Sequence, residues 1–362
     1  MKALVVESFG APFTLADVDL ADPIGREVLV EVKASGLCHS DLAAAQYDLG
    51  LPVPSVLGHE VAGVVVGLGP EVTEFAIGDH VVGCLVQYCG RCDRCLSGRI
   101  NQCRHPEATL RSADQPPRLS LNSKPLFQGM GLGGFAERSL IHESQLVRLP
   151  DGMPFPQAAL MGCGVATGAG AVINTARVQA GDAVVVIGCG GVGLNAISGA
   201  ITAGATTIIA VDIADEKLET ARRVGATHVV NSKATDPVAA VQEITGDGAD
   251  AVFDFVGLPE ATKQGWEMAN KGGGLYLIGS INPETSLAFT NIEAVVMQKR
   301  VQGVYMGSTV PKRDLPMYAE LYLAGRFNLD DLVSKEISLD QVNEGYQALH
   351  DPSVTRVVIT SF

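Results

Sequence analysis

Four of the eight cysteines lie close together in the sequence, with a spacing typical of a metal site. They are Cys89, Cys92, Cys95 and Cys103, in the pattern C-x-x-C-x-x-C-x7-C. Two residues between thiols let a tight turn point both sulfurs at one ion, and Gly90 and Gly98 supply backbone freedom. Four thiolates fill the tetrahedral shell of zinc, so the pattern predicts a structural zinc site. An iron–sulfur cluster or four free thiols are the alternatives that the ligand type leaves open.

A second set of metal-binding side chains is dispersed along the chain. Cys38 lies in Gly36–Asp41, His59 lies between Gly58 and Glu60, and Cys163 lies between two glycines. Two thiolates and an imidazole would leave one position of a zinc ion open, as catalysis requires. Spacing alone does not show that these residues converge, and each could also be a packed core residue.

A glycine-rich segment is typical of dinucleotide binding. It comprises Gly188, Cys189, Gly190, Gly191, Val192 and Gly193, and matches G-x-G-x-x-G. It follows an apolar run, opens a helical stretch and is followed nineteen residues later by Asp212. In this context the glycines allow close approach of a pyrophosphate, and the carboxylate binds the adenosine ribose. Asp212 would repel a 2′-phosphate and Ile213 follows it in place of an arginine, so NAD is favoured over NADP.

The elements around these residues fall into two classes. The first third is rich in strand-like runs such as 28–32 and 61–66, and 104–133 reads as a long surface loop. From residue 183 strands and helices alternate, as expected of a doubly wound parallel sheet. The expected strands are 183–187, 207–211, 227–230, 251–254 and 274–278. The expected helices are a stretch after the glycines that ends at about residue 203, and 215–224, 237–244 and 259–268. The tail ends on an expected strand, 356–360.

Composition limits the partners and the compartment. The chain has 362 residues, 47% of them hydrophobic, and a formal net charge of −14. This length predicts about two domains, and the acidic balance argues against nucleic acid or an anionic membrane surface. No signal peptide and no uninterrupted apolar stretch long enough for a bilayer are visible, so we expect a cytoplasmic protein.

The chain resembles the medium-chain zinc-dependent alcohol dehydrogenases over nearly its whole length. The matching segments are Gly36–Asp41, Gly58–Glu60, the four-cysteine segment, Gly162–Gly164 with Thr167 and Gly168, the glycine loop at Gly188, and the tail from Val342–Tyr346 through Arg356. The resemblance implies a Rossmann NAD-binding domain at 165–305 and a mostly β, GroES-like catalytic domain at 1–164 and 306–362. It also implies two zinc ions per chain and a homo-oligomer, with a dimer favoured and a tetramer possible.

The resemblance assigns roles at the catalytic zinc. Cys38, His59 and Cys163 would bind the metal, Asp41 would hydrogen-bond the histidine, and Glu60 would lie behind the metal as an alternate ligand. Ser40 would accept the proton of the alcohol, although a serine here could also simply cap a helix. Many relatives end this proton relay on a histidine three residues further on, where this chain has Ala43. Water is then the default final acceptor.

Further family positions concern the cofactor. His39 stands where relatives often have an arginine against the pyrophosphate, so it should hold the cofactor less tightly near neutral pH. Lys217 would assist at the ribose, Arg356 at the pyrophosphate, and Thr167 also belongs to the expected cofactor site. Cys84 and Cys189 fall outside both metal sets and are expected to pack in the core.

The expected function is reversible hydride transfer between a primary or aromatic alcohol and NAD, with zinc activating the alcohol as an alkoxide. A carrier-thiol-dependent formaldehyde dehydrogenase is the first alternative. Its glutathione-dependent form is disfavoured by Tyr47, Leu49 and Glu107, which stand where those relatives have two acidic residues and an arginine. A non-enzymatic binding module is the second alternative, although the full set of catalytic residues argues against it.

Overall fold

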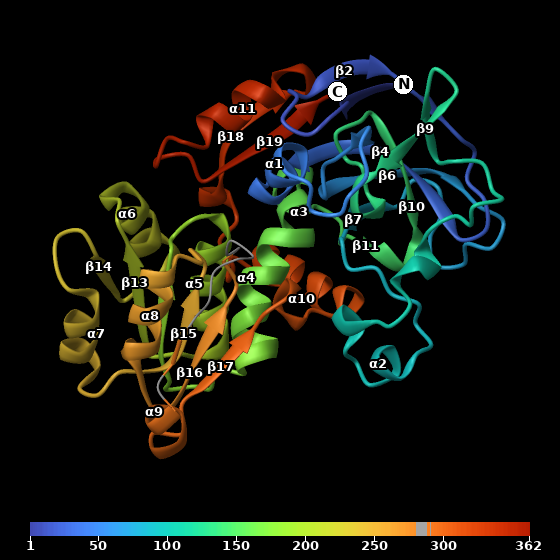
Figure 1. The fold of residues 1–362 in the computed structure, drawn as a ribbon. Coiled ribbons are helices and arrows are strands. Elements are labelled where there is room, and N and C mark those ends of the chain that lie inside the picture. Colours follow the sequence, from blue (N-terminus) through green and yellow to red (C-terminus); the bar gives the residue numbers. More distant parts are fainter. Residues whose placement is uncertain (280–287, 290) are drawn as a thin grey trace. The chain divides into compact units, whose positions relative to one another are not determined.

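The computed structural model describes residues 1–279, 288–289 and 291–362. The chain divides into two compact units. Unit 1 comprises Met1–Cys163, Val310–Gly325 and Leu332–Phe362, and unit 2 comprises Gly164–Thr309 and Arg326–Asp331. Figure 1 shows the elements of both units.

Unit 1 is built mainly from two β-sheets, as the strand-like runs in the first third predict. One has the order β2-β1-β5-β9-β8-β3, and the other β11-β7-β6-β4-β19-β18, with β10 also paired to β4. The first sheet consists of β1 (Lys2–Val6), β2 (Thr14–Asp17), β3 (Asp19–Leu20), β5 (Ser55–Val56), β8 (Leu119–Leu121) and β9 (Lys124–Gln128). The second consists of β4 (Glu27–Gly36), β6 (Glu60–Leu68), β7 (His80–Gly83), β10 (Arg138–His142), β11 (Leu146–Arg148), β18 (Val333–Ser338) and β19 (Arg356–Ser361).

Short helices complete unit 1. They are α1 (His39–Gln46), α2 (Asp93–Leu96), α3 (Phe155–Leu160), α10 (Pro311–Leu323) and α11 (Val342–Ala348). Apolar residues of β1, β19, α1 and α11 share one core cluster with Phe13 and Phe135. The C-terminal segment therefore packs directly against the segment that carries Cys38.

Unit 2 contains a six-stranded, wholly parallel sheet. Its order is β14-β13-β12-β15-β16-β17, the strand order of a dinucleotide-binding Rossmann fold. The strands are β12 (Ala183–Ile187), β13 (Thr207–Asp212), β14 (His228–Asn231), β15 (Ala249–Asp254), β16 (Ala269–Leu277) and β17 (Arg300–Gly303). The helices are α4 (Ala166–Gly170), α5 (Gly191–Ala203), α6 (Asp215–Val224), α7 (Pro237–Thr245), α8 (Pro259–Met268) and α9 (Asn291–Val296). Helix α5 packs on α6, and α7 on α8.

The prediction of a plain surface loop at 104–133 is wrong. Strands β8 and β9 form a hairpin there, joined by Asn122 and Ser123, whose φ angles are 51° and 64°. Two successive left-handed residues are the mark of a type I′ turn, which matches the twist of paired strands. Arg118 in this segment is buried and donates hydrogen bonds to Glu27 Oε1 and to the carbonyl of Thr109, both at 2.7 Å.

One helical stretch is long and apolar enough to cross a bilayer. It runs from Phe155 to Ala176, and 83% of its apolar window is buried inside the protein, as in a core helix. The sequence analysis considered only uninterrupted apolar runs and did not identify this helical stretch.

Candidate active site and metal centres

Four buried side chains from three separate segments of unit 1 converge on one point. Cys38, His59, Glu60 and Cys163 each offer one ligand atom, and these atoms lie within 4.8 Å of one another. His59 Nε2 lies 3.2 Å from Cys163 Sγ, and the Ser40 hydroxyl lies 3.2 Å from Cys38 Sγ. The structure thus brings together the dispersed residues whose convergence spacing could not show.

The sheet positions three of these residues. Cys38 follows β4 and is the N-cap of α1, while His59 directly precedes β6. Strands β4 and β6 are antiparallel neighbours in which Gly36 pairs with Glu60. A side chain at Gly36 would collide with the Glu60 carboxylate and would have to displace it. Cys163 lies in a π-helical segment, Met161–Val165, a local irregularity that is frequent at functional sites.

Asp41 fixes the orientation of His59. Its Oδ2 lies 2.8 Å from His59 Nδ1, and its Oδ1 accepts the N–H of Gly58 at 3.0 Å. A carboxylate beside Nδ1 favours the proton on that nitrogen, which leaves Nε2 free to bind a metal. The contact predicted between Asp41 and the histidine is therefore present.

The electrostatics of this cluster fit a cation. A hydrogen bond from Cys163 and the charge of His59 bring the pKa of Cys38 well below its usual range. Burial raises the pKa of Glu60 to about 7 despite the nearby Arg356. Arg356 Nη2 lies 3.5 Å from Glu60 Oε1, and neither Glu60 oxygen has a hydrogen-bond partner among the described residues. Two thiols, an imidazole and an unsatisfied carboxylate are a donor set that suits zinc.

The four clustered cysteines form a second site, the cysteine lobe (residues 89–103). Their sulfurs also lie within 4.8 Å of one another. Cys92 Sγ lies 3.5 Å from Cys95 Sγ and 3.9 Å from Cys103 Sγ. The N–H groups of Cys89 and His105 point at Cys103 Sγ, at 3.2 and 3.3 Å. Backbone N–H groups, chiefly that of Arg104, lower the pKa of Cys92 to about 6. This favours the thiolate that a metal needs.

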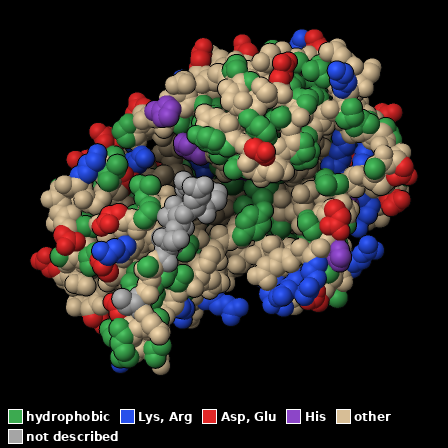
Figure 2. Space-filling model, in the orientation of Figure 1, with side chains coloured by type: hydrophobic (Ala, Val, Ile, Leu, Met, Phe, Trp, Pro, Cys, Tyr) green, Lys and Arg blue, Asp and Glu red, His purple; other side chains and the backbone are tan. Residues whose placement is uncertain are grey.

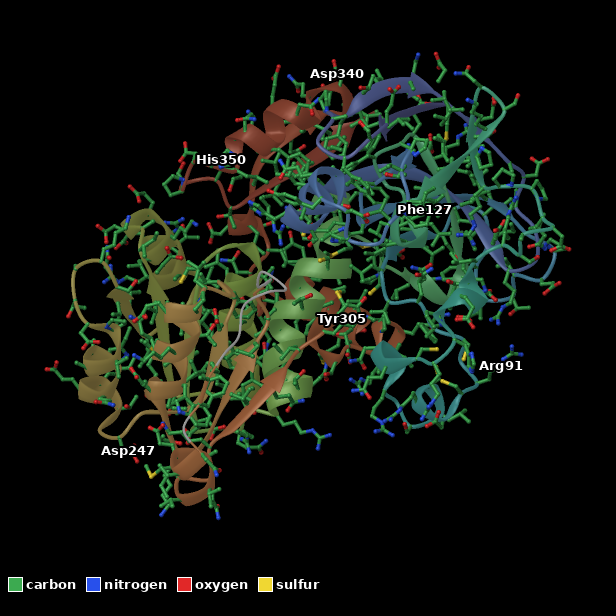
Figure 3. The ribbon with its side chains drawn as sticks, in the orientation of Figure 1. Arg91, Phe127, Asp247, Tyr305, Asp340 and His350 are labelled. Carbon is green, nitrogen blue, oxygen red and sulfur yellow. The ribbon has the colours of Figure 1, made fainter. Side chains whose placement is uncertain are left out.

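The cysteine lobe is basic in an otherwise acidic chain. Arg91, Arg94, Arg99 and Arg104 lie between or beside the cysteines, and Asp93 is the one acidic residue among them. Figure 2 shows blue side chains gathered over the part that contains α2, and Figure 3 shows Arg91 pointing outward from it. Zinc with four thiolates carries a net charge of −2, which these arginines offset.

The glycine loop of unit 2 has the geometry expected for a dinucleotide. Gly188 directly follows β12 and has φ 92°, and a side chain at Gly193 would collide with the Gly188 carbonyl. A side chain at Gly190 would meet nothing within 4 Å, so the backbone is open to a ligand there. Asp212 ends β13, and its carboxylate accepts N–H groups of Cys189 (2.7 Å), Ile213 (2.7 Å) and Ala214 (3.1 Å).

Comparison with known proteins decides the family. The model of the alcohol dehydrogenase GroES-like domain matches residues 25–151, and that of zinc-binding dehydrogenases matches 191–324. The NDMA-dependent alcohol dehydrogenase of Amycolatopsis methanolica is 39% identical over 99% of this chain and 98% of its own. This chain belongs to the zinc-dependent alcohol dehydrogenase family. The S-(hydroxymethyl)glutathione dehydrogenase of Paracoccus denitrificans is 35% identical over 99% of both chains.

A solved structure supports the same family assignment. Benzyl alcohol dehydrogenase from Acinetobacter calcoaceticus superposes with a TM-score of 0.94 and 34% identity, over 100% of this chain and 99% of that one. The chain is thus an oxidoreductase of the zinc alcohol dehydrogenase family, and the α/β fold with a Rossmann domain and a GroES-like domain is confirmed. The non-enzymatic alternative is not supported. The prediction of two zinc sites agrees with the family and with the two clusters.

The remaining predicted positions lie in different surroundings. Ser40 and His39 are exposed at the start of α1, and Ala43 is half-buried on the same helix. In unit 2, Thr167 donates to Met306 Sδ at 3.5 Å, and Lys217 lies on α6. Cys84 and Cys189 are buried, as expected, and burial raises the pKa of Cys84 to about 12.

Two residues of the C-terminal segment contact the Cys38 segment of this dehydrogenase. Arg356 is buried and donates to the carbonyl of Leu37 at 3.3 Å. Tyr346 donates to the carbonyl of Cys38 at 3.2 Å. The sequence analysis missed the Tyr346 contact, because a separation of 308 residues leaves no spacing signal.

Proposed function

We propose that this dehydrogenase catalyses reversible hydride transfer between a primary or aromatic alcohol and NAD. The observation that carries the proposal is the buried cluster of Cys38, His59 and Cys163 with the Ser40 hydroxyl beside it. Together they offer three metal donors and one proton acceptor at a single point. The similarity to benzyl alcohol dehydrogenase supports an aromatic substrate.

Each residue at this site would have a distinct role. Cys38, His59 and Cys163 would hold zinc, with Glu60 behind it as an alternate ligand, and Asp41 keeps the imidazole in register. Zinc, when bound, supplies a Lewis acid that lowers the pKa of the alcohol. The Ser40 hydroxyl would accept the proton of the alcohol and pass its own proton onward. Ala43 offers no base to accept the proton from Ser40, so water would accept it.

The cofactor would bind at the carboxyl edge of the unit 2 sheet. The loop from Gly188 to Gly193, with Gly191 and Val192 starting α5, would receive the pyrophosphate. Asp212 would bind the adenosine ribose, since three backbone N–H groups hold its carboxylate at the end of β13. His39, Thr167, Lys217 and Arg356 complete the proposed cofactor contacts. Unit 1 would then be the catalytic domain and unit 2 the NAD-binding domain.

The proposed assembly is a homodimer in the cytoplasm. Support for a dimer comes from β17, an edge strand of the unit 2 sheet in which all four residues are exposed. Nearby in sequence, α9 has no buried residue, and Ile292 and Val295 are 68% and 67% exposed. An exposed edge strand with apolar neighbours is prone to pair with a second chain.

A carrier-thiol-dependent formaldehyde dehydrogenase is the second candidate. Whole-length similarity to an S-(hydroxymethyl)glutathione dehydrogenase favours it. The glutathione form itself is disfavoured, since Tyr47 and Leu49 are exposed apolar side chains and Glu107 adds a negative charge. None of these residues would attract a glutathione carboxylate.

One assay panel tests the proposal. Benzyl alcohol, short primary alcohols and the matching aldehydes are turned over with NAD and with NADP, and formaldehyde is added with and without thiol carriers. We expect the highest kcat/KM with an aromatic or primary alcohol and NAD. Turnover only of formaldehyde with a thiol carrier would select the second candidate, and equal use of both cofactors would refute the role of Asp212.

A further inference from the structure

The C-terminal helix α11 contacts the first residue of the catalytic cluster. The Tyr346 hydroxyl on α11 donates a hydrogen bond of 3.2 Å to the main-chain carbonyl of Cys38, and Tyr346 is only 4% exposed. None of the roles assigned above includes this residue.

The ring of Tyr346 is held in place from the other end of the chain. It stacks on Phe13 with ring centroids 5.5 Å apart and an interplanar angle of 17°. The side chain of Asn343, also on α11, accepts the N–H of Phe13 (3.1 Å) and donates to its carbonyl (2.9 Å). Phe13 in turn lies edge-on against Phe135, with centroids 5.7 Å apart. The hydroxyl therefore has little freedom to move away from Cys38.

The accepting carbonyl lies where the main chain changes direction. Cys38 is extended, with φ −110° and ψ 142°, and the helix α1 begins at the next residue. Its carbonyl also accepts the N–H groups of Asp41 (3.1 Å) and Leu42 (3.4 Å). The side chain of Cys38, the N-cap residue, makes no capping hydrogen bond at this helix start. Rotation of the Cys38 peptide would turn the thiol away from the cluster and move Ser40 and Asp41 with it.

We propose that Tyr346 is a positioning residue for the catalytic metal: its hydroxyl fixes the Cys38 peptide, and thereby aims the Cys38 thiolate at the ion. The inference rests on the proposed ligation of zinc by Cys38. A hydroxyl that only satisfies a buried polar group would stabilise the fold without affecting the metal. The two roles differ in what happens to one zinc ion when the hydroxyl is removed.

The test compares two tyrosine-to-phenylalanine substitutions in the full-length zinc-loaded enzyme. Tyr346→Phe removes the hydroxyl and keeps the stacked ring. Tyr276→Phe is the matched control, because Tyr276 in unit 2 is also buried, stacks on a phenylalanine and accepts one hydrogen bond, from Arg300. Zinc release to excess chelator, the visible spectrum after cobalt replaces the catalytic zinc, and thermal unfolding are measured for each.

We expect Tyr346→Phe to release one zinc about tenfold faster, at the low end for residues that orient a metal ligand. The second zinc should leave at the wild-type rate, and the thiolate–cobalt absorption should shift. Tyr276→Phe should change neither. Unchanged release and an unchanged spectrum in Tyr346→Phe would overturn the proposal. Faster loss of both ions, or the same change in the control, would show a general effect on stability and would also overturn it.

A second variant covers the case in which Tyr346→Phe does not fold. Phe13→Leu removes the stacking partner and keeps the hydroxyl, so release of one zinc should quicken by a smaller factor. An unchanged rate there would count against the proposal. If Cys38→Ser retains both zinc ions, the ligand assignment itself is wrong, and the role of Tyr346 is lost with it.

Discussion

The two metal clusters of this dehydrogenase are built in opposite ways. The four thiols of the cysteine lobe fall within fifteen residues, and the elements around them are the four-residue helix α2 and turns. The ligands of the catalytic cluster run from Cys38 to Cys163, and all four are buried at the ends of β4 and β6 and in a helix. A local cluster without a surrounding core depends on its metal for shape. A dispersed cluster is held by the core, and the metal is free to serve catalysis.

The largest expected effect is on activity, from the dispersed site. Cys163→Ala should lose one of two zinc ions and abolish turnover, because a thiolate ligand is gone. The free energy of unfolding should fall by only about 1 kcal/mol, a usual value for one substitution, since β4 and β6 remain paired. Metal analysis, benzyl alcohol oxidation and thermal unfolding check this. Collapse of the fold would mean that the core does not hold the catalytic cluster.

In the cysteine lobe, loss of a ligand should mainly reduce stability. Cys95→Ala removes the buried sulfur of the cysteine lobe and should lose the other zinc. Structural zinc contributes on the order of 10 kcal/mol to the folding of small zinc domains, so we expect a loss of several kcal/mol in this larger protein. Proteolysis should then cut first within the lobe. Arg91→Gln is the control, because it changes the same surface without removing a ligand. An unaltered melting temperature of Cys95→Ala would break the contrast between the two clusters.

Proton transfer belongs to the dispersed site and should be affected less than metal loss. Ser40→Ala should lower kcat for alcohol oxidation about a hundredfold, the low end for a lost general acid–base group. Ser40→Thr keeps the hydroxyl and should retain activity. Zinc content should stay at two in both variants, since Ser40 lies beside Cys38 without being a proposed ligand. Equal activity of the alanine and threonine variants would remove Ser40 from the mechanism.

The same contrast explains how much could be predicted from sequence. Regular periodicity gave the bounds of α6 and α8 correctly, and the cysteine lobe and the glycine loop were readable because their residues are neighbours in the chain. The hairpin β8–β9 was missed because its turn, Asn122-Ser123, lacks the usual glycine. The convergence of Cys38, His59 and Cys163 came only from family resemblance. The contact of Tyr346 with Cys38 could come only from the structure, because tertiary packing alone creates it.

The glycine loop, like the cysteine lobe, is formed by residues that are neighbours in the sequence. Substitution of Asp212, at the end of the next strand, tests its proposed role in the choice between NAD and NADP. Asp212→Gly should reduce the preference for NAD over NADP by about thirtyfold or more, since the ribose hydrogen bond and the repulsion of a 2′-phosphate are each worth about 1–3 kcal/mol. The carboxylate also holds the N–H groups of Cys189 and Ile213, so Asp212→Asn is the sharper variant. It removes the charge that repels a 2′-phosphate and keeps one acceptor oxygen for the N–H groups of Ile213 and Ala214, while its amide nitrogen cannot accept the N–H of Cys189. Ratios of kcat/KM for the two cofactors decide the outcome, and an unchanged ratio in both variants would exclude Asp212 from cofactor choice.

The smallest expected effect concerns the last step of proton release at the dispersed site. Ala43 lies three residues after Ser40 on α1, so the two side chains share a face of the helix. Ala43→His would place an imidazole there, and an imidazole with a pKa near 6.5 accepts protons at pH 7 but is already protonated below pH 6. The oxidation rate should therefore rise about fivefold near neutral pH, well below the hundredfold of a direct acid–base group.

That gain should vanish in acid, where the imidazole is charged, and shrink above pH 9, where solvent accepts protons readily. Ala43→Gln is the matched control, because its side chain is similar in size and has no base. Pre-steady-state rates with a deuterated alcohol show whether hydride transfer limits turnover in each variant. A neutral-pH rate that stays constant in Ala43→His while hydride transfer is limiting would mean that protons already leave by another route. His39, exposed at the start of the same helix, would then be the next residue to replace.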